Sequence, residues 1–283
     1  MSSIAKNFKY YFLGILFLGA IFVWYAALAE TRNGLKVAFL DVGQGDAIFI
    51  EAPNGNQVLI DGGPNKEVLR ELSKQMPFYD RTIDAVILTH PHLDHYAGLN
   101  EVMEKYKVNL EMDSGTKNKS AGFVEFESLI KDKNIKRLYA KRGMRVNLDK
   151  DLRLDILLPV VSGENLSEHD GMLVSRLVYK DNSFLLTGDM EDNLENFLLS
   201  LGDSLKSDVL KVGHHGSRTS TSEKFLGWAD PFLAVISAGE KNKYGHPHPE
   251  VTDRLVRFGI PTLRTDEKGT IVLKSDGEKI LAK

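Results

Sequence analysis

The chain has 283 residues, a formal net charge of −3 and no cysteine. A chain of this length forms one large domain or two small ones with a sizeable core, and its near-neutral charge gives no general attraction to nucleic acid. The absence of cysteine excludes disulfides, thiolate metal ligands and cysteine nucleophiles.

The N-terminus has the pattern of a membrane segment. A short basic stretch, residues 1–9, precedes residues 10–29, which are uncharged and mostly apolar. Roughly 20 such residues can cross a bilayer as a helix. The preceding Lys6 and Lys9 favour a cytoplasmic N-terminus, so we expect a single-pass cell-membrane protein with residues 30–283 outside the cytoplasm. The alternatives are a buried soluble helix and a cleaved signal, after which the body would be secreted, because Ala27-Leu28-Ala29 resembles a cleavage site.

The remainder, residues 30–283, alternates between short apolar strands and helices. Strands are expected at residues 35–40, 47–51, 57–60, 83–88, 137–139, 145–148, 152–158, 173–179, 184–186, 208–212, 232–237, 262–264 and 270–274. Helices are expected at residues 66–75, 98–106, 121–132, 191–200, 222–228 and 249–258. These patterns predict an α/β sandwich of four layers, with two sheets flanked by helices.

Seven of the eight histidines fall in three clusters, the first of which reads His90-Pro91-His92-Leu93-Asp94-His95. Imidazole nitrogens and carboxylate oxygens are common ligands of zinc and similar ions. Histidines two apart on an extended segment point the same way, and the carboxylate and histidine that follow can serve a second ion. This spacing predicts a bimetal hydrolytic centre, with two ions ~3.5–4 Å apart. A polar turn of surface histidines is the alternative.

Several motifs resemble the metallo-β-lactamase fold. Asp61-Gly62-Gly63, the first histidine cluster and Leu186-Thr187-Gly188-Asp189 occur in the order typical of that fold. More narrowly, the chain resembles the hydrolase domain of ComEC-type DNA-uptake proteins. The segments that carry this resemblance are residues 39–46, 186–189, 210–217 and 237–248.

The resemblance implies a set of site residues around two divalent ions, zinc or manganese. The implied metal ligands are His90, His92, Asp94, His95, Asp189, His214 and His246. The implied catalytic residues are Asp94, His215 and His248, and the implied substrate-binding residues are Lys211, Ser217, Asn242 and Tyr244. Asp189 would bridge the two ions, and Asp61 would orient ligand histidines from behind. Which histidine of each later pair binds metal stays open.

The chain also departs from the family pattern. The full transporter has many spans and an oligonucleotide-binding-type domain, for which this chain has no room, so we expect that it is not the uptake channel. Where the family shows an Asn-rich turn, this chain has His169-Asp170-Gly171-Met172. His169 is either a further ligand or a surface residue, and Asp170 is a candidate for the asparagine's role.

Two segments are candidates for phosphate contact. Residues 131–145 are rich in lysine and arginine and could hold a nucleic-acid backbone, although a solvated surface is the plainer interpretation. Residues 217–222 resemble a helix N-cap whose amides could bind phosphate, although ordinary capping is the plainer interpretation.

These features favour a membrane-anchored, metal-dependent hydrolase that cleaves phosphodiesters, with DNA as the substrate implied by the resemblance. A second hypothesis is hydrolysis of another phosphodiester, such as phosphocholine on a cell-wall polymer. A third is lactone or β-lactam opening. The non-enzymatic alternative is a binding module in which metal acts as a structural clip. The expected partners are the substrate and the lipid bilayer, and no protein partner is inferred.

Overall fold

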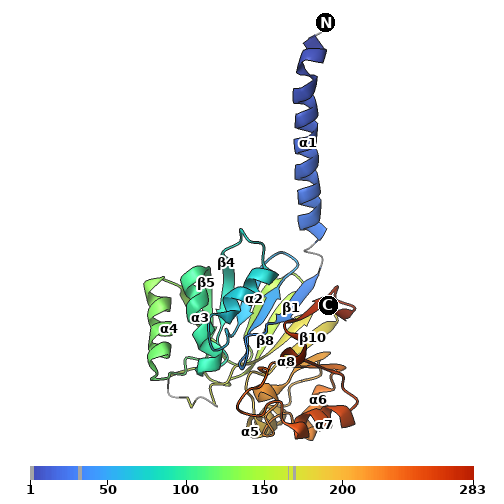
Figure 1. The fold of residues 1–283 in the computed structure, drawn as a ribbon. Helices are drawn as coiled ribbons and strands as arrows, with labels where there is room; N and C mark the ends of the chain where they lie inside the picture. Colours follow the sequence, from blue (N-terminus) through green and yellow to red (C-terminus); the bar gives the residue numbers. More distant parts are fainter. Residues whose placement is uncertain (1–2, 31–33, 165, 168–169) are drawn as a thin grey trace.

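Short apolar segments form the strands of two sheets in the computed structural model, which describes residues 3–30, 34–164, 166–167 and 170–283 (Figure 1). The eight-stranded sheet has the order β15 (Ile280–Ala282), β14 (Ile271–Ser275), β1 (Leu35–Phe39), β2 (Ile48–Glu51), β3 (Gln57–Ile60), β4 (Thr82–Ile87), β5 (Lys107–Asp113) and β6 (Lys136–Tyr139). The seven-stranded sheet has the order β13 (Thr262–Arg264), β12 (Leu233–Ile236), β11 (Val209–Lys211), β10 (Asn182–Leu186), β9 (Val174–Tyr179), β8 (Leu152–Leu158) and β7 (Arg145–Asp149).

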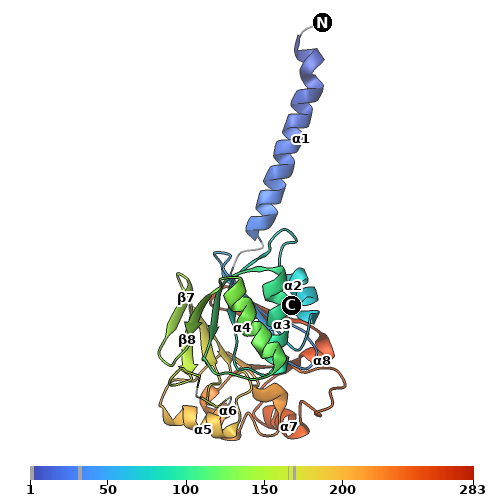
Figure 2. The same ribbon diagram turned by 90° about the vertical axis from the view of Figure 1, so that its left-hand side faces the viewer.

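Helices cover the outer face of each sheet (Figures 1 and 2). The eight-stranded sheet packs against α2 (Glu67–Gln75), α3 (Leu93–Lys105) and α4 (Ala121–Asp132). The seven-stranded sheet packs against α5 (Asp192–Ser200), α6 (Glu223–Ala229) and α7 (Pro249–Arg257). The short helices are η1 (Gly213–Gly216), of 3-10 type, and α8 (Thr265–Lys268).

Side chains that point alternately to the two faces of each strand pack one face against the other sheet and the other face against helices. In β1, Val37 and Phe39 face the core between the two sheets, whereas Ala38 faces the helices. Successive strand residues point to opposite faces, so a strand buried on both sides reads as a continuous apolar run. The four-layer α/β sandwich predicted from the sequence is confirmed.

Strand direction determines where the chemistry lies. In the first sheet β1, β3, β4, β5 and β6 run in the same direction, because β2 is antiparallel to both of its neighbours and the later pairs are parallel. In the second sheet β10 to β13 are mutually parallel. Parallel strands bring their carboxyl ends to one edge, where ligand sites of such sheets usually form.

The structure differs from the sequence prediction in several elements: β15, η1 and α8 were not predicted, and two further differences, in α3 and β5, lie near functional or buried polar residues. Helix α3 begins at Leu93, inside the histidine motif, and not at residue 98. Its Gly98 lies against Gly62, whose carbonyl oxygen would be 1.8 Å from a Cβ there, so only glycine permits this close packing. Strand β5 was not predicted, because its Glu111 and Asp113 read as polar although both are buried against Arg137.

The N-terminal helix α1 covers Ser3–Glu30. Its segment Asn7–Tyr25 is long and apolar enough to cross a membrane, and this segment is not buried against the body. The expectation of an N-terminal apolar helix is confirmed, and its length and composition suit an anchor or a signal sequence equally well.

Candidate metal centre

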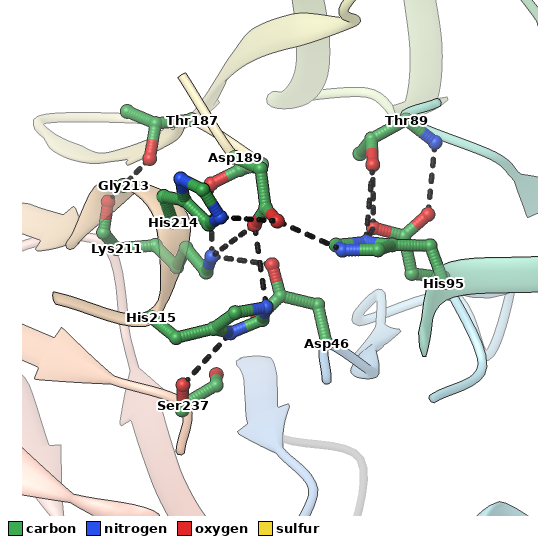
Figure 3. Close-up of polar contacts among 12 residues, drawn as sticks. Asp46, Thr89, His95, Thr187, Asp189, Lys211, Gly213, His214, His215 and Ser237 are labelled. Atoms are coloured by element: carbon green, nitrogen blue, oxygen red, sulfur yellow. Dashed lines mark hydrogen bonds and ion pairs between the residues drawn. The ribbon is translucent and has the colours of Figure 1, made fainter. Parts of the chain in front are cut away.

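The residues of the candidate site, ligands and supporting groups alike, follow strands of both sheets and meet at a single edge. Asp46 follows β1, Asp61 follows β3, and His90 follows β4. From the other sheet, Asp189 follows β10 and His215 lies in η1 after β11. Figure 3 shows Asp46 and His95 from one sheet converging with Asp189 and His215 from the other. The fold thus joins residues far apart in the sequence.

Asp189 lies at the centre of this cluster (Figure 3). Its carboxylate is 3.3 Å from Nε2 of His95 and 3.5 Å from Nε2 of His215. Nε2 of His214 and Nε2 of His90 are 3.8 and 3.9 Å from the same carboxylate. Four imidazoles therefore direct the same ring nitrogen at one carboxylate.

The partners of the other ring nitrogens determine the tautomers. Nδ1 of His215 donates to the Ser237 carbonyl at 3.0 Å, because a carbonyl can only accept. Nδ1 of His95 is 2.8 Å from the Asp61 carboxylate, and Nδ1 of His214 is 3.0 Å from Glu191. With Nδ1 donating, a neutral imidazole keeps its lone pair on Nε2.

Nδ1 of His90 is also a donor, and its acceptor is the Thr89 hydroxyl. The Thr89 hydroxyl donates to Asp61 at 2.7 Å, so its oxygen accepts from Nδ1 of His90 at 3.2 Å. His92 lies beside His90, with ring centroids 4.3 Å apart. Supporting carboxylates and carbonyls behind ligand histidines are a regular feature of metal sites.

Unpaired buried atoms indicate that this cluster fits a cation. Buried polar atoms are normally hydrogen-bonded, yet four at this centre have no hydrogen-bond partner among the described residues. These atoms are Nε2 of His90, His95 and His215 and Oδ1 of Asp189. Ligand atoms of Asp94, His95, Asp189 and His215 lie within 4.8 Å of one another. Nitrogen and carboxylate donors without sulfur suit a divalent ion such as zinc or manganese.

The electrostatics of the cluster are strongly perturbed. Burial alone would lower the pKa of His215, but the charges of Asp189 and Asp46 raise it to about 10. Burial opposes ionisation of Asp189 too, yet His215 and His95 hold its pKa well below the usual value. The pKa of Asp94 falls to about 2 despite burial, through His215 and His95. The carboxylates of Asp189 and Asp94 therefore stay ionised and require positive charge beside them.

Lys211 and Asp46 form a buried pair behind the ligands. The Lys211 side chain is fully buried, forms an ion pair with Asp46 and donates to the Gly188 carbonyl at 2.9 Å. This position corrects the expected substrate-binding role of Lys211, because its ammonium has no surface that a substrate could reach. Asp46 was not assigned from the sequence, although its place in the segment of residues 39–46 was a usable signal. Glu191, behind His214, was also missed.

The last histidine pair lies beside the cluster in the loop before α7. The His246 ring centroid is 5.7 Å from that of His214, and its Nδ1 is buried without a hydrogen-bond partner among the described residues. His248 is different, because its Nδ1 caps α7 by accepting from the Glu250 amide at 3.3 Å. His246 is therefore placed to join a metal site, whereas His248 presents Nε2 as a donor.

The loop that carries His246 is organised by Asn242. The Asn242 amide group donates to the carbonyls of Gly239 and His246 and accepts from the backbone amides of Tyr244 and His246. These bonds use its polar atoms internally, so the structure favours a shaping role over the expected substrate contact. Tyr244 stacks on His246 with centroids 5.9 Å apart and remains exposed, as a substrate-binding residue must.

The segment after the histidine pair behaves as a cap. Ser222 caps α6 by accepting from the Phe225 amide, and Glu195 accepts from the amides of Thr221 and Ser222. Ser217 is buried and bonds to the Thr219 hydroxyl. These amides are therefore already used, which supports the capping interpretation. Ser217, expected to bind substrate, faces its own loop.

His169 and Asp170, which precede β9, were candidates for a further ligand and for the role of the family's asparagine. His169 lies outside the described residues. Asp170 is exposed, and its carboxylate accepts from the Ser167 hydroxyl at 2.7 Å.

The basic segment of residues 131–145 does not form one cationic strip. Arg137 lies against Glu111, Asp113 and Glu127. Arg142 pairs with Asp203, and Arg145 pairs with Asp155. The lysines of this segment have no carboxylate partner in the part of the chain that the structure describes; they are Lys131, Lys133, Lys136 and Lys141. The arginines are structural, and only the lysines present free charge.

Comparison with known sequences identifies the family. The profile of the Metallo-beta-lactamase superfamily matches residues 40–239, a span that contains the whole Asp189 cluster. The chain belongs to this superfamily. It is a metal-dependent hydrolase by family, and its cluster is of the type that holds a divalent metal.

Curated relatives of this superfamily member are competence proteins. ComE operon protein 3 of Bacillus subtilis is 34% identical over 264 residues, which cover 83% of this chain and 32% of that protein. Recombination protein 2 of Haemophilus influenzae is 34% identical, covering 83% of this chain and 28% of that protein. Competence protein ComA of Neisseria gonorrhoeae is 29% identical, and the match covers 88% of this chain and 34% of that protein. The chain thus spans about a third of the length of these relatives.

Solved structures agree on the fold. The metallo-beta-lactamase fold protein YhfI from Bacillus subtilis superposes with a TM-score of 0.51 and 15% identity, covering 81% of this chain and 95% of that one. Zn(2+)-bound PqqB from Methylobacterium extorquens has a TM-score of 0.54 and 10% identity, covering 85% and 100%. Identities this low speak for the fold alone.

Proposed function

We propose that this chain is a metal-dependent phosphodiesterase that acts on DNA at the outer surface of the cell membrane. The observation that carries the hydrolase assignment is the convergence of four histidines, His90, His95, His214 and His215, whose Nε2 atoms all face Asp189. The DNA substrate rests on the competence relatives and on the resemblance of several motifs to DNA-uptake proteins.

The proposed ligand set divides around Asp189. His90, His92 and His214 would hold one ion, and Asp94, His95 and His246 contribute to a second, with Asp189 shared between them. When bound, two divalent ions activate water and neutralise the charge on phosphodiester oxygens. The negative charge of Asp189 would be shared by both ions and would reduce the repulsion between the two cations.

Protein side chains supply the proton-handling groups. Asp94 is one-third exposed and lies 3.5 Å from Nε2 of His215, so this pair stands at the solvent side of the cluster. In its neutral form His248 carries its proton on Nε2, because Nδ1 accepts from the backbone amide of Glu250. We assign His248 to protonation of the leaving oxygen and the Asp94–His215 pair to orientation of the attacking water. Exposed Tyr244 provides a flat face for a nucleobase.

We further propose that α1 anchors the chain, with the body outside the cytoplasm. The length and composition of Asn7–Tyr25 support a span, and the lysines before it favour an inward N-terminus. In the test, the full chain should sediment with membranes, and protease added to cells stripped of their wall should degrade the body. Recovery of the body in the medium would support cleavage of a signal instead, and complete protection would contradict an outer location.

The substrate is tested with the purified chain loaded with zinc or manganese. Single- and double-stranded DNA, a chromogenic phosphodiester and a choline phosphodiester are offered in parallel, with Asp189→Ala as the matched inactive control. The proposal predicts DNA cleavage that the control lacks. Turnover of the choline ester without DNA cleavage would transfer the assignment to the other phosphodiester class. Tight metal binding without any turnover would favour a binding module.

A further inference from the structure

The edge of the body opposite the metal centre is where the chain enters the fold. Strands β1, β4, β5 and β6 start at this edge, since they run in the same direction. Leu35, the first residue of β1, follows α1 in the chain after only a short connection. The metal ligands follow the other ends of β1, β3 and β4. We call this entry side, formed by the turns before β4, β5 and β6, the opposite edge.

The turn before β4, residues 77–80, exposes two aromatic side chains at the opposite edge. Phe78 is 86% exposed and Tyr79 is 49% exposed, and their rings meet edge to face with centroids 5.4 Å apart. No large apolar side chain among the described residues is more exposed than Phe78. Figure 1 shows this turn at the top of the body, away from α5, α6 and α7. Two adjacent aromatic side chains exposed on a protein surface suggest a site of contact with a partner or a membrane.

Basic side chains share the opposite edge with this aromatic pair. The exposed basic residues of the turns before β4, β5 and β6 are Arg81, Lys105, Lys107, Lys133 and Lys136. The acidic residues of the same turns are Asp80, Glu104 and Asp132, and the Asp80 carboxylate already accepts from Gln57 and Thr82. The balance is positive. Aromatic rings beside lysine and arginine are the composition of protein surfaces at the membrane interface.

We propose that the opposite edge lies on the bilayer, with Phe78 and Tyr79 in the headgroup layer and Lys133 and Lys136 against anionic headgroups. This inference rests on the proposed anchoring by α1, which would hold the same edge at the membrane. DNA is a poorer occupant, because a strand bound here would lie at the far ends of the strands from Asp189. The lysines of residues 131–136 thereby acquire a role that the catalytic site does not give them.

Docking on this edge orients the active site. Strand β4 has six residues, which at ~3.3 Å each separate the aromatic turn from His90 by ~20 Å. The metal centre would then face away from the bilayer and take substrate from the medium or the cell wall. A polymer could reach it without competing with lipid.

The test uses the full chain in vesicles with two single-tryptophan variants, since Trp24 and Trp228 are the native tryptophans. W24F/W228F/F78W reports on the aromatic turn, and W24F keeps Trp228 as the matched control on α6 at the other end of the body. Vesicles contain phosphatidylcholine with or without phosphatidylglycerol, and brominated lipid quenches tryptophan on contact. Y79W in the W24F/W228F background gives a second reading should F78W fold poorly.

The proposal predicts that brominated lipid quenches most of the emission of the F78W variant and little of the Trp228 emission of the control. It also predicts weaker quenching of the F78W variant in anionic vesicles when Lys133 and Lys136 are changed to glutamate. Unquenched emission from both the F78W and the Y79W variants, in chains that sediment with vesicles, would overturn the docking and leave the anchor intact.

Two further outcomes would also overturn the proposal. A chain that does not sediment with vesicles would overturn both the docking and the anchor. A change in the emission of the F78W variant on adding an oligonucleotide without lipid would assign the opposite edge to nucleic acid.

Discussion

The ammonium of Lys211 and the carboxylate of Asp46 form an ion pair inside the protein, with side chains that are 0% and 2% exposed. The same ammonium is 3.9 Å from Oδ1 of Asp189, and the other oxygen of Asp46 is 3.5 Å from Nδ1 of His215. The pair therefore joins the loop between β1 and β2 of one sheet to β11 of the other, beside the central carboxylate. The Lys211 ammonium thereby places a positive charge beside Asp189 that does not come from a metal.

Removing one member of this pair should destabilise the fold. Lys211→Met leaves the Asp46 charge buried and unpaired, which typically costs about 3–5 kcal/mol. Urea unfolding measures this cost. The double variant Lys211→Met with Asp46→Asn should recover much of the loss, because no uncompensated charge remains. Equal stability of Lys211→Met and the unaltered chain would show that the pair is not a structural connection between the sheets.

Asp61 supports the centre from behind and should affect metal affinity more than fold. Asp61 accepts from Nδ1 of His95 and from the Thr89 hydroxyl, so Asp61→Ala releases both groups. Loss of such a supporting carboxylate lowers metal affinity or activity by roughly 10–100-fold. Titration with zinc, read by calorimetry, checks this, with the exposed Asp132→Ala as control. Unchanged affinity in Asp61→Ala would remove Asp61 from the centre.

Much of this architecture could be predicted from the sequence, because its signals are local. Apolar alternation gave the strands and the layers, and the spacing of His90, His92 and Asp94 gave the metal hypothesis. The partners of the ligands depend on contacts across the sheets, which no local pattern reports. Lys211 reads as a polar motif residue, yet the strand that carries it turns it inward toward Asp46. In the same way β5 was missed, since Arg137 allows its acidic residues to be buried.

Free cations on the metal side should govern DNA affinity. Arg218 and Lys243 are exposed, follow the ligand loops and have no carboxylate partner among the described residues. Each phosphate contact contributes about 0.7–0.9 to the log–log salt slope, so changing both to alanine should flatten the slope by that amount per contact. Binding is measured without added metal. The matched control is the double variant Lys133→Ala with Lys136→Ala, which should leave the salt slope unchanged. If the control flattens the slope more than the Arg218 and Lys243 changes do, DNA binds at the opposite edge.

Buried Glu111 should make stability depend on pH. Burial, and then the charge of Asp113, hold the pKa of Glu111 well above its usual value of 4.5. The folded state therefore binds this proton more tightly than the unfolded chain, and stability falls as pH rises from 4.5 toward the raised value. Glu111→Gln lacks this loss, so it should gain stability relative to the unaltered chain between pH 5 and 8 in urea unfolding. A relative loss at pH 8 would mean that ionised Glu111 stabilises Arg137.

The central claim is that Asp189 organises a catalytic metal centre, and metal content with turnover tests it most directly. The purified chain and Asp189→Ala are loaded with zinc or manganese, dialysed and compared by elemental analysis, circular dichroism and hydrolysis of a chromogenic phosphodiester. The account predicts two equivalents of metal and turnover in the unaltered chain. In Asp189→Ala it predicts the same fold, lower metal content and no turnover. Full turnover in Asp189→Ala would contradict it.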